Sequence, residues 1–173
     1  MKLYLLRHGK AEPREGPGLR DDASRALTPE GRRRVELAAR GMRRMGLRFD
    51  RILSSPLVRA RETAEIVAAV LDAGVEVEFS KWLAEDDRQV ELIQEIRSLR
   101  PPPENLLLVG HEPWLSELVA LLIGGGPMLP IRFKKSGLAC LSINALEPGP
   151  CGVLEWLLAP RQLRLLGGED LEP

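Results

Sequence analysis

The only two histidines of the chain occupy matching places in the sequence. His8 follows the apolar run 3–6, His111 follows the apolar run 106–109, and each histidine adjoins a glycine. Continuous apolar runs of this length are typical of strands that are covered on both faces. We expect the two runs to be neighbouring strands of one sheet. Because ligands of open α/β sheets bind beyond the carboxyl ends of the strands, we expect both imidazoles to face one ligand.

Two arginines and a serine belong to the same expected edge of the sheet. Arg7 directly precedes His8. Ser55 follows a third expected strand, and Arg59 lies on the first turn of the helix that Ser55 is expected to cap. A guanidinium fork binds phosphate oxygens in a bidentate way, and two unit charges ~4 Å apart at an effective dielectric constant of ~20 attract by about 4 kcal/mol. These residue types predict a cationic pocket for a doubly charged phosphoryl group.

The same arginines bear on the protonation of the histidines. Neighbouring guanidinium groups lower the pKa of an imidazole, because like charges disfavour its protonation. We therefore expect one histidine to remain a neutral nucleophile and the other to become a charged donor once the dianion binds. Two histidines and a carboxylate can also bind zinc or iron, but the chain has no HxH or HExxH spacing. Since the arginines would repel a cation, we expect neither a metal nor another cofactor.

Alternating strands and helices must position these side chains. Thr28 and Pro29 are a typical N-cap and first position of a helix. We expect strands at residues 2–6, 49–53, 75–79, 106–109, 137–143 and 153–158, and helices that begin near 29, 55, 87 and 112. This alternation predicts an α/β fold with three layers, α/β/α, around a mostly parallel central sheet. At 173 residues, we expect one domain over 1–173 without a large cap.

The composition excludes several classes of protein. Hydrophobic content of 44%, charged content of 29% and zero formal net charge are ordinary for a globular protein and give no reason to expect nucleic acid or a membrane as partner. The two cysteines cannot form a disulfide framework. No apolar stretch approaches the length of a membrane span, which is about 20 residues. The first apolar run is too short for a signal peptide. We expect a cytoplasmic location.

Four segments together resemble a known family. "LLRHGKAE", "LTPEGRRR", "ILSSPLVRARETAEIV" and "LVGHEPWLSEL" occur in this order over residues 2–122 and resemble the histidine phosphatase, or phosphoglycerate-mutase-like, superfamily. The tripeptide RHG alone is weak evidence, whereas its combination with SSPLxRAxxTA and a later GHxP is highly specific. Because the chain is short, it looks most like the phosphohistidine phosphatase branch of the SixA type, which lacks capping insertions.

The resemblance implies roles for individual residues. His8 matches the nucleophile that accepts the phosphoryl group. The rest of the phosphate pocket corresponds to Arg7, Arg59 and His111.

Three further residues are candidates for the same site. Ser55 lies in the matching SSP turn, and backbone N–H groups near Gly137 are expected to face the pocket. Glu85 is the nearest match to the family's proton donor, although a solvated loop carboxylate is an equal alternative. A phosphohistidine substrate would need little help from an acid, because imidazole leaves more readily than an alkoxide.

The resemblance implies a metal-independent phosphatase that works through a phosphohistidine enzyme intermediate and hydrolyses phosphohistidine on a protein. The alternatives are a small-molecule phosphomonoesterase, a phosphoglycerate-mutase-like enzyme, or a module that only binds phosphorylated protein. A mutase must exclude water from its intermediate, and loop 10–26 is the only sizeable candidate cover. A pure binding module would not need His8. The expected partner is thus a phosphorylated protein or a small phosphorylated metabolite.

Overall fold

A six-stranded mixed sheet organises the chain, of which the computed structural model describes residues 1–13, 22–85, 87–126 and 129–168. Its strand order is β3-β2-β4-β1-β5-β6. The strands are β1 (Lys2–Arg7), β2 (Arg51–Ser54), β3 (Val77–Phe79), β4 (Asn105–Gly110), β5 (Leu138–Ile143) and β6 (Gly152–Leu158). The pairs β1·β4, β4·β2 and β2·β3 are parallel, and β5 and β6 are added antiparallel. The prediction that the two strands before the histidines are neighbours is confirmed.

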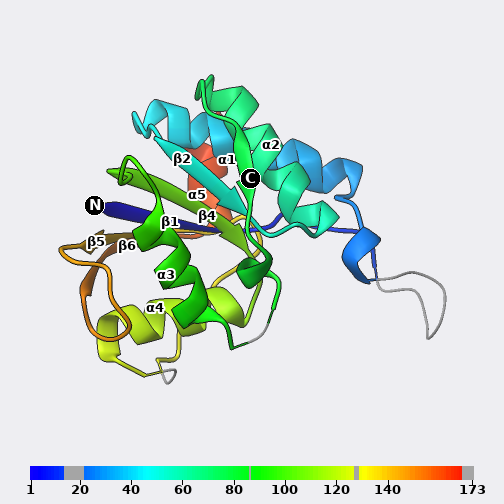
Figure 1. Cartoon of the computed structure of the whole chain (residues 1–173). Helices are drawn as coiled ribbons and strands as arrows, with labels where there is room; N and C mark the ends of the chain where they lie inside the picture. The colour runs from blue at the N-terminus through cyan, green and yellow to red at the C-terminus, as the bar shows by residue number, and fades with distance from the viewer. Residues whose placement is uncertain (14–21, 86, 127–128, 169–173) are drawn as a thin grey trace.

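Helices cover both faces of this sheet (Figure 1). The α-helices are α1 (Pro29–Arg44), α2 (Val58–Leu71), α3 (Gln89–Ser98), α4 (Trp114–Gly124) and α5 (Pro160–Leu166), and two short 3-10 helices are η1 (Asp22–Ser24) and η2 (Lys81–Leu83). Helices α1, α2 and α5 lie on one face, and α3 and α4 lie on the other. The predicted three-layer α/β/α fold is confirmed, and the described residues form no large cap.

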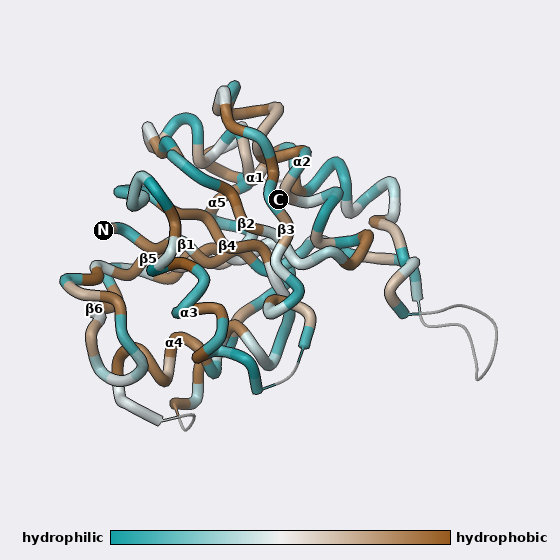
Figure 2. Tube along the Cα trace, in the orientation of Figure 1, coloured by the Kyte–Doolittle hydropathy of each residue, from teal (hydrophilic) through white to brown (hydrophobic). Residues whose placement is uncertain are grey.

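The alternation of side chains along β1 divides the core into two clusters. Leu3 and Leu5 pack with the apolar faces of α3 and α4, whereas Tyr4 and Leu6 pack with those of α1, α2 and α5. The residues 106–109 of β4 are fully buried because both faces of this central strand are covered. Figure 2 shows the same distribution, with hydrophobic strands inside and hydrophilic segments on the outer helices.

The start of α1 agrees with the sequence prediction. Thr28 is the N-cap, and its hydroxyl accepts a hydrogen bond of 2.9 Å from the backbone N–H of Gly31. A Cβ atom at Gly31 would lie 2.0 Å from the carbonyl oxygen of Lys10. Glycine at this position therefore lets the segment that leaves β1 pass close to the helix.

One expectation about the helices was wrong, and one helix was missed. Helix α2 begins at Val58 with Leu57 as N-cap, not with Ser55, because Ser55 makes tertiary contacts that are described below. Helix α5 was not predicted from the sequence; its Leu163 is fully buried against α1. No described helix has the length and apolar content that crossing a membrane requires.

Candidate active site

The carboxyl ends of three adjacent parallel strands form the edge that carries the candidate site. His8 follows β1, Ser55 follows β2 and His111 follows β4. The backbone N–H of His8 donates to the carbonyl of Gly110 at 3.1 Å, and that of Ser55 donates to the carbonyl of Val109 at 2.9 Å. The two imidazole rings lie with their centroids 5.0 Å apart and their planes at 51°. The expected approach of the two histidines is therefore present in the fold.

His8 is held as one defined tautomer. Its ring is buried, and Nδ1 lies 2.7 Å from the carbonyl oxygen of Gly9. Because a carbonyl oxygen can only accept, Nδ1 carries the hydrogen and Nε2 keeps its lone pair. Burial, and then the nearby His111, Arg59 and Arg7, lower the pKa of His8 to about 3, although the bond to Gly9 acts in the opposite direction. At neutral pH the ring is uncharged and Nε2 is a nucleophile.

A buried threonine holds the residue whose carbonyl orients this ring. The backbone N–H of Gly9 donates to Oγ1 of Thr63 at 3.1 Å, and the Thr63 hydroxyl donates to the carbonyl of Arg59 at 2.6 Å. A Cβ atom at Gly9 would lie 2.6 Å from Cγ2 of Val35, so glycine allows the close packing of this segment on α1. Thr63 thus joins the turn after His8 to helix α2, which also carries Arg59.

His111 is oriented by Ser55. Its Nε2 lies 2.8 Å from Oγ of the fully buried Ser55, which also accepts a 3.3 Å hydrogen bond from the N–H of Leu57. Burial is the main cause that lowers the pKa of His111 to about 4; Arg59 lowers the pKa further, and Asp22 opposes this. Nδ1 of His111 is buried and has no hydrogen-bond partner among the described residues. With Nε2 bound to Ser55, Nδ1 is the ring atom left for a ligand.

Two guanidinium groups flank the rings. Nη1 of Arg7 donates to the carbonyl of Phe133 at 2.7 Å, and burial lowers the pKa of Arg7 while Glu112 raises it. Arg59 is 6% exposed and donates to Asp22, from Nη1 to the backbone carbonyl at 2.7 Å and from Nη2 to Oδ2 at 2.9 Å. Arginine remains protonated even when burial lowers its pKa, so both groups keep a positive charge in the site.

A cavity of about 260 Å³ opens beside His111. Asp22, Arg59, His111 and Glu112 supply its polar lining, and the remaining wall comes from residues 57, 83–84 and 113–114. A larger groove of about 590 Å³ lies around the beginnings of β2, β3 and β4, with Glu104 in its lining, and holds neither histidine. The smaller cavity is lined by His111 and Arg59, whereas His8 and Arg7 are not among its lining residues.

Comparison with known proteins decides the family. A model of the histidine phosphatase superfamily (branch 1) matches residues 3–87. A protein of Haemophilus influenzae named phosphohistidine phosphatase SixA homolog is 30% identical over 149 residues, which cover 82% of this chain and 87% of that protein. The chain belongs to the histidine phosphatase superfamily. It is a phosphatase with the fold of SixA-type members.

Solved structures agree with this assignment. A structure of the protein histidine phosphatase SixA complexed with tungstate superposes with a TM-score of 0.76 at 26% identity and covers 94% of this chain and 99% of that one. The α-ribazole phosphatase of Shigella flexneri shares the fold, with a TM-score of 0.71 at 21% identity over 92% of this chain and 97% of its own. The alternative of a pure binding module is thereby set aside.

Glu85, the expected proton donor, does not line the cavity. Glu85 is exposed, and its carboxylate lies 3.9 Å from Nε of Arg88. The half-buried acid in the cavity is instead Glu112, whose carboxylate accepts hydrogen bonds from the N–H of Ser116 at 3.2 Å and from its hydroxyl at 2.8 Å. Burial raises the pKa of Glu112. From its sequence context Glu112 was expected only at the start of a helix; its position next to His111 was the available signal.

The expected donor role of Gly137 is not supported. The N–H of Gly137 donates to the carbonyl of Lys134 at 2.8 Å, and the N–H of Ser136 donates to the carbonyls of Arg7 and His8 at 2.9 and 3.2 Å. The Gly137 carbonyl in turn accepts the N–H of Arg7 at 3.1 Å. Because these donors are already used within the backbone, the segment secures the end of β1 and does not offer N–H groups to a substrate.

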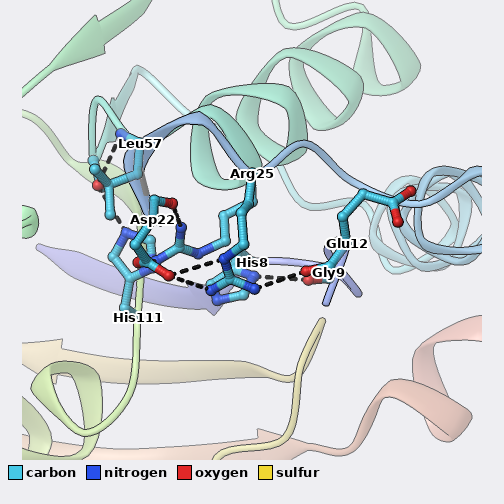
Figure 3. A network of polar contacts seen from close by, with 9 residues as sticks. His8, Gly9, Glu12, Asp22, Arg25, Leu57 and His111 are labelled. Carbon is cyan, nitrogen blue, oxygen red and sulfur yellow. Dashed lines mark hydrogen bonds and ion pairs between the residues drawn. The ribbon is translucent and has the colours of Figure 1, made fainter. Parts of the chain in front are cut away.

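Asp22 and Arg25 also belong to the site, although their sequence context indicated only that they lie in the loop 10–26. Asp22 lines the cavity and contacts Arg59, and Nε of Arg25 donates to Oδ1 of Asp22 at 2.8 Å. Figure 3 shows this network beside the two histidines. Residues 14–21 of the loop lie outside the described part, so its expected role as a cover stays a prediction. Among the described residues, no group of three or more His, Cys, Asp or Glu is arranged to hold a metal ion.

Proposed function

We propose that this phosphatase hydrolyses phosphohistidine on a protein, without a metal, through a covalent phosphoryl group on His8. The observation that carries the proposal is the tautomer of His8. The Gly9 carbonyl, 2.7 Å from Nδ1, leaves the lone pair on Nε2, and the second imidazole lies at a centroid distance of 5.0 Å. A neutral imidazole whose reactive nitrogen is defined in advance is an activated nucleophile.

In the first step, Nε2 of His8 attacks phosphorus in line with the leaving nitrogen. The new Nε2–P bond forms as the P–N bond of the substrate breaks, and the electron pair of that bond goes to the departing ring. A phosphohistidine that is protonated on its other nitrogen leaves as neutral imidazole, so this step requires no external acid. Arg7, Arg59 and His111 hold the equatorial oxygens, over which charge spreads in a loose transition state.

In the second step, water attacks the phosphorylated His8. The P–Nε2 bond breaks, its electron pair returns to the ring, and inorganic phosphate leaves. His111 assists both steps through Nδ1, because a bound dianion favours the protonated ring and makes it a charged donor. Ser55 acts as a positioning residue, since its hydroxyl lies 2.8 Å from Nε2 and directs the opposite side of the ring to the phosphoryl group.

The protein substrate is supported by the SixA-named relative and structural neighbour and by the absence of a large cap from the described residues. The alternative is a small phosphorylated metabolite. It is favoured by one observation: the cavity beside His111 has a volume of only about 260 Å³ and an apolar wall, which suits a small leaving group. The reaction at phosphorus is the same for both classes of substrate.

The test compares kcat/KM for a phosphorylated phosphotransfer domain with kcat/KM for 3-phosphoglycerate and several sugar phosphates. We expect preference for the protein by at least about 100-fold, and no turnover or covalent labelling in His8→Ala. The matched control is Arg61→Ala, which removes an exposed arginine of the same helix as Arg59. Preference for a metabolite would refute the substrate assignment, and full activity of His8→Ala would refute the mechanism.

We also propose that the chain forms one catalytic domain over residues 1–173 and acts in the cytoplasm without a cofactor, nucleic acid or membrane partner. Both cysteines are unpaired, which agrees with a reducing compartment. Limited proteolysis tests the first statement, since a single domain should give no stable fragment. Cell fractionation tests the second, and activity after dialysis against a chelator tests the absence of a metal.

A further inference from the structure

We propose that Arg25 is a third guanidinium ligand of the phosphoryl group. In the ligand-free site, the Asp22 carboxylate occupies the position of the phosphoryl group as an internal anion, and the substrate displaces it. The proposal rests on the proposed function only because it uses the same phosphate-binding site, formed by Arg7, Arg59 and the two imidazoles, which we call the cradle. It adds one binding residue and one competing group to that cradle. Neither residue belongs to the segments that carry the resemblance to the family.

The contacts of Asp22 are those expected for a bound oxyanion. Oδ2 lies 2.9 Å from Nη2 of Arg59, and Oδ1 lies 2.7 Å from Nη2 and 2.8 Å from Nε of Arg25. Oδ2 thus faces Arg59 and Oδ1 faces Arg25, whose Nε and Nη2 both contact this oxygen. Carboxylate and phosphate share this mode of binding to arginine. The site that the two arginines form is therefore already an anion site.

Arg25 is held in place independently of Asp22. Its Nη1 donates to the carbonyl of Glu12 at 2.8 Å, a contact that Figure 3 shows on the side of the guanidinium away from Asp22. The N–H of Glu12 donates to the carbonyl of Ala26 at 2.9 Å, and Ala11 forms a bridge with Leu27. Because the residues that directly follow Arg25 are bound to the segment that leaves β1, its guanidinium stays near the phosphate-binding site when the carboxylate leaves.

Asp22 can leave without dismantling the cradle. Its backbone carbonyl separately accepts a hydrogen bond of 2.7 Å from Nη1 of Arg59. Rotation of the side chain would release Nη2 of Arg59 and the fork of Arg25, while the main-chain contact keeps η1 in position. The Asp22 side chain is 33% exposed, whereas those of Arg25 and Arg59 are 17% and 7% exposed. The carboxylate is thus the member of the network that has room to move toward solvent.

Electrostatics favours the exchange. Arg7, Arg25 and Arg59 each lower the pKa of His111, and Asp22 is the acid that raises it. The same three arginines also lower the pKa of Lys135, after the larger effect of its burial. Two carboxylates, Asp22 and Glu112, line the cavity, so the three guanidinium groups outnumber the acids that face them there. A phosphoryl dianion carries twice the charge of a carboxylate and offers three oxygens, so it satisfies more of these donors.

The test measures tungstate binding by calorimetry, since tungstate is a tetrahedral dianion and its binding requires no turnover. We expect Asp22→Asn to bind tungstate about tenfold more tightly than the wild type, because the internal competitor loses its charge, and Arg25→Ala to bind roughly 10- to 100-fold more weakly. Arg25→Lys keeps the charge without the fork and should lie between the wild type and Arg25→Ala. Arg61→Ala is again the control for loss of an exposed arginine.

The outcomes are decisive in both directions. Unchanged or weaker tungstate binding by Asp22→Asn would overturn the displacement, and Arg25→Ala binding like Arg61→Ala would overturn direct ligation. If thermal unfolding shows that Arg25→Ala does not fold, Arg25→Lys is used for the test instead. Tungstate binding by Arg25→Lys with wild-type affinity would then overturn the assignment. If the variants show these changes in tungstate affinity but the wild type does not hydrolyse phosphohistidine, the proposed substrate is refuted and the present proposal stands.

Discussion

The two histidines make the stability of the protein sensitive to weakly acidic pH. Both are kept neutral in the folded state, with the pKa of His8 lowered to about 3 and that of His111 to about 4, mainly by burial. In the unfolded chain a histidine titrates near 6.5. Between these values the unfolded state binds more protons, so the free energy of unfolding falls as the pH is lowered from about 6.5 toward the folded-state values.

The magnitude at pH 5 follows from the unfolded state alone. As long as the folded-state pKa lies well below 5, each histidine costs about 1.4 kcal/mol for every pH unit below 6.5, or about 2 kcal/mol at pH 5. Since the chain has two histidines and both lie in the site, their combined cost is about 4 kcal/mol relative to pH 7.

Urea unfolding at pH 7 and pH 5, at one ionic strength, measures this difference. His8→Asn and His111→Asn should each lose about 2 kcal/mol less stability than the wild type between the two pH values, and the double variant about 4 kcal/mol less. Carboxylates such as Glu112, whose pKa is raised by burial, are common to all variants and cancel in the comparison. If each single variant loses as much stability as the wild type, the histidines are not buried as neutral groups and the reasoning fails.

Three further substitutions test separate parts of the structure. Ser55→Ala removes the 2.8 Å contact to the second imidazole and should lower kcat/KM about tenfold with a small change in thermal midpoint. Gly31→Ala would place a Cβ atom 2.0 Å from the Lys10 carbonyl and should reduce the unfolding free energy by about 2 kcal/mol, despite the better helix propensity of alanine. Glu85→Gln should leave phosphohistidine turnover within about twofold of the wild type, whereas a loss of about tenfold or more would restore Glu85 as the proton donor.

Local patterns were sufficient where local forces decide the structure. The cap at Thr28 was predicted because its hydroxyl and the N–H of Gly31 are three residues apart in the sequence. The strands before His8 and His111 were predicted because burial on both faces requires a continuous apolar run. Since parallel neighbours end at the same edge, the meeting of the two rings followed from the strand assignment.

The errors occurred where a distant partner outweighs the local preference. Ser55 is a good N-cap by residue type, but its hydroxyl bonds to His111, 56 residues away. Arg59 and Asp22 are 37 residues apart, and nothing in the composition of loop 10–26 indicates their contact. Helix α5 has only seven residues, too few for a periodic pattern, and its stability comes from packing on α1.

The group that selects the reactive nitrogen of His8 is a main-chain carbonyl, that of Gly9. No exchange of one side chain for another can delete this acceptor, so mutation can alter the nucleophile only by moving the backbone, for instance through the Thr63 hydroxyl that accepts the N–H of the same residue. Attempts to retune the chemistry in the laboratory should accordingly begin at Thr63 and at the glycine itself, and libraries confined to cavity-lining positions would leave the identity of the attacking atom untouched.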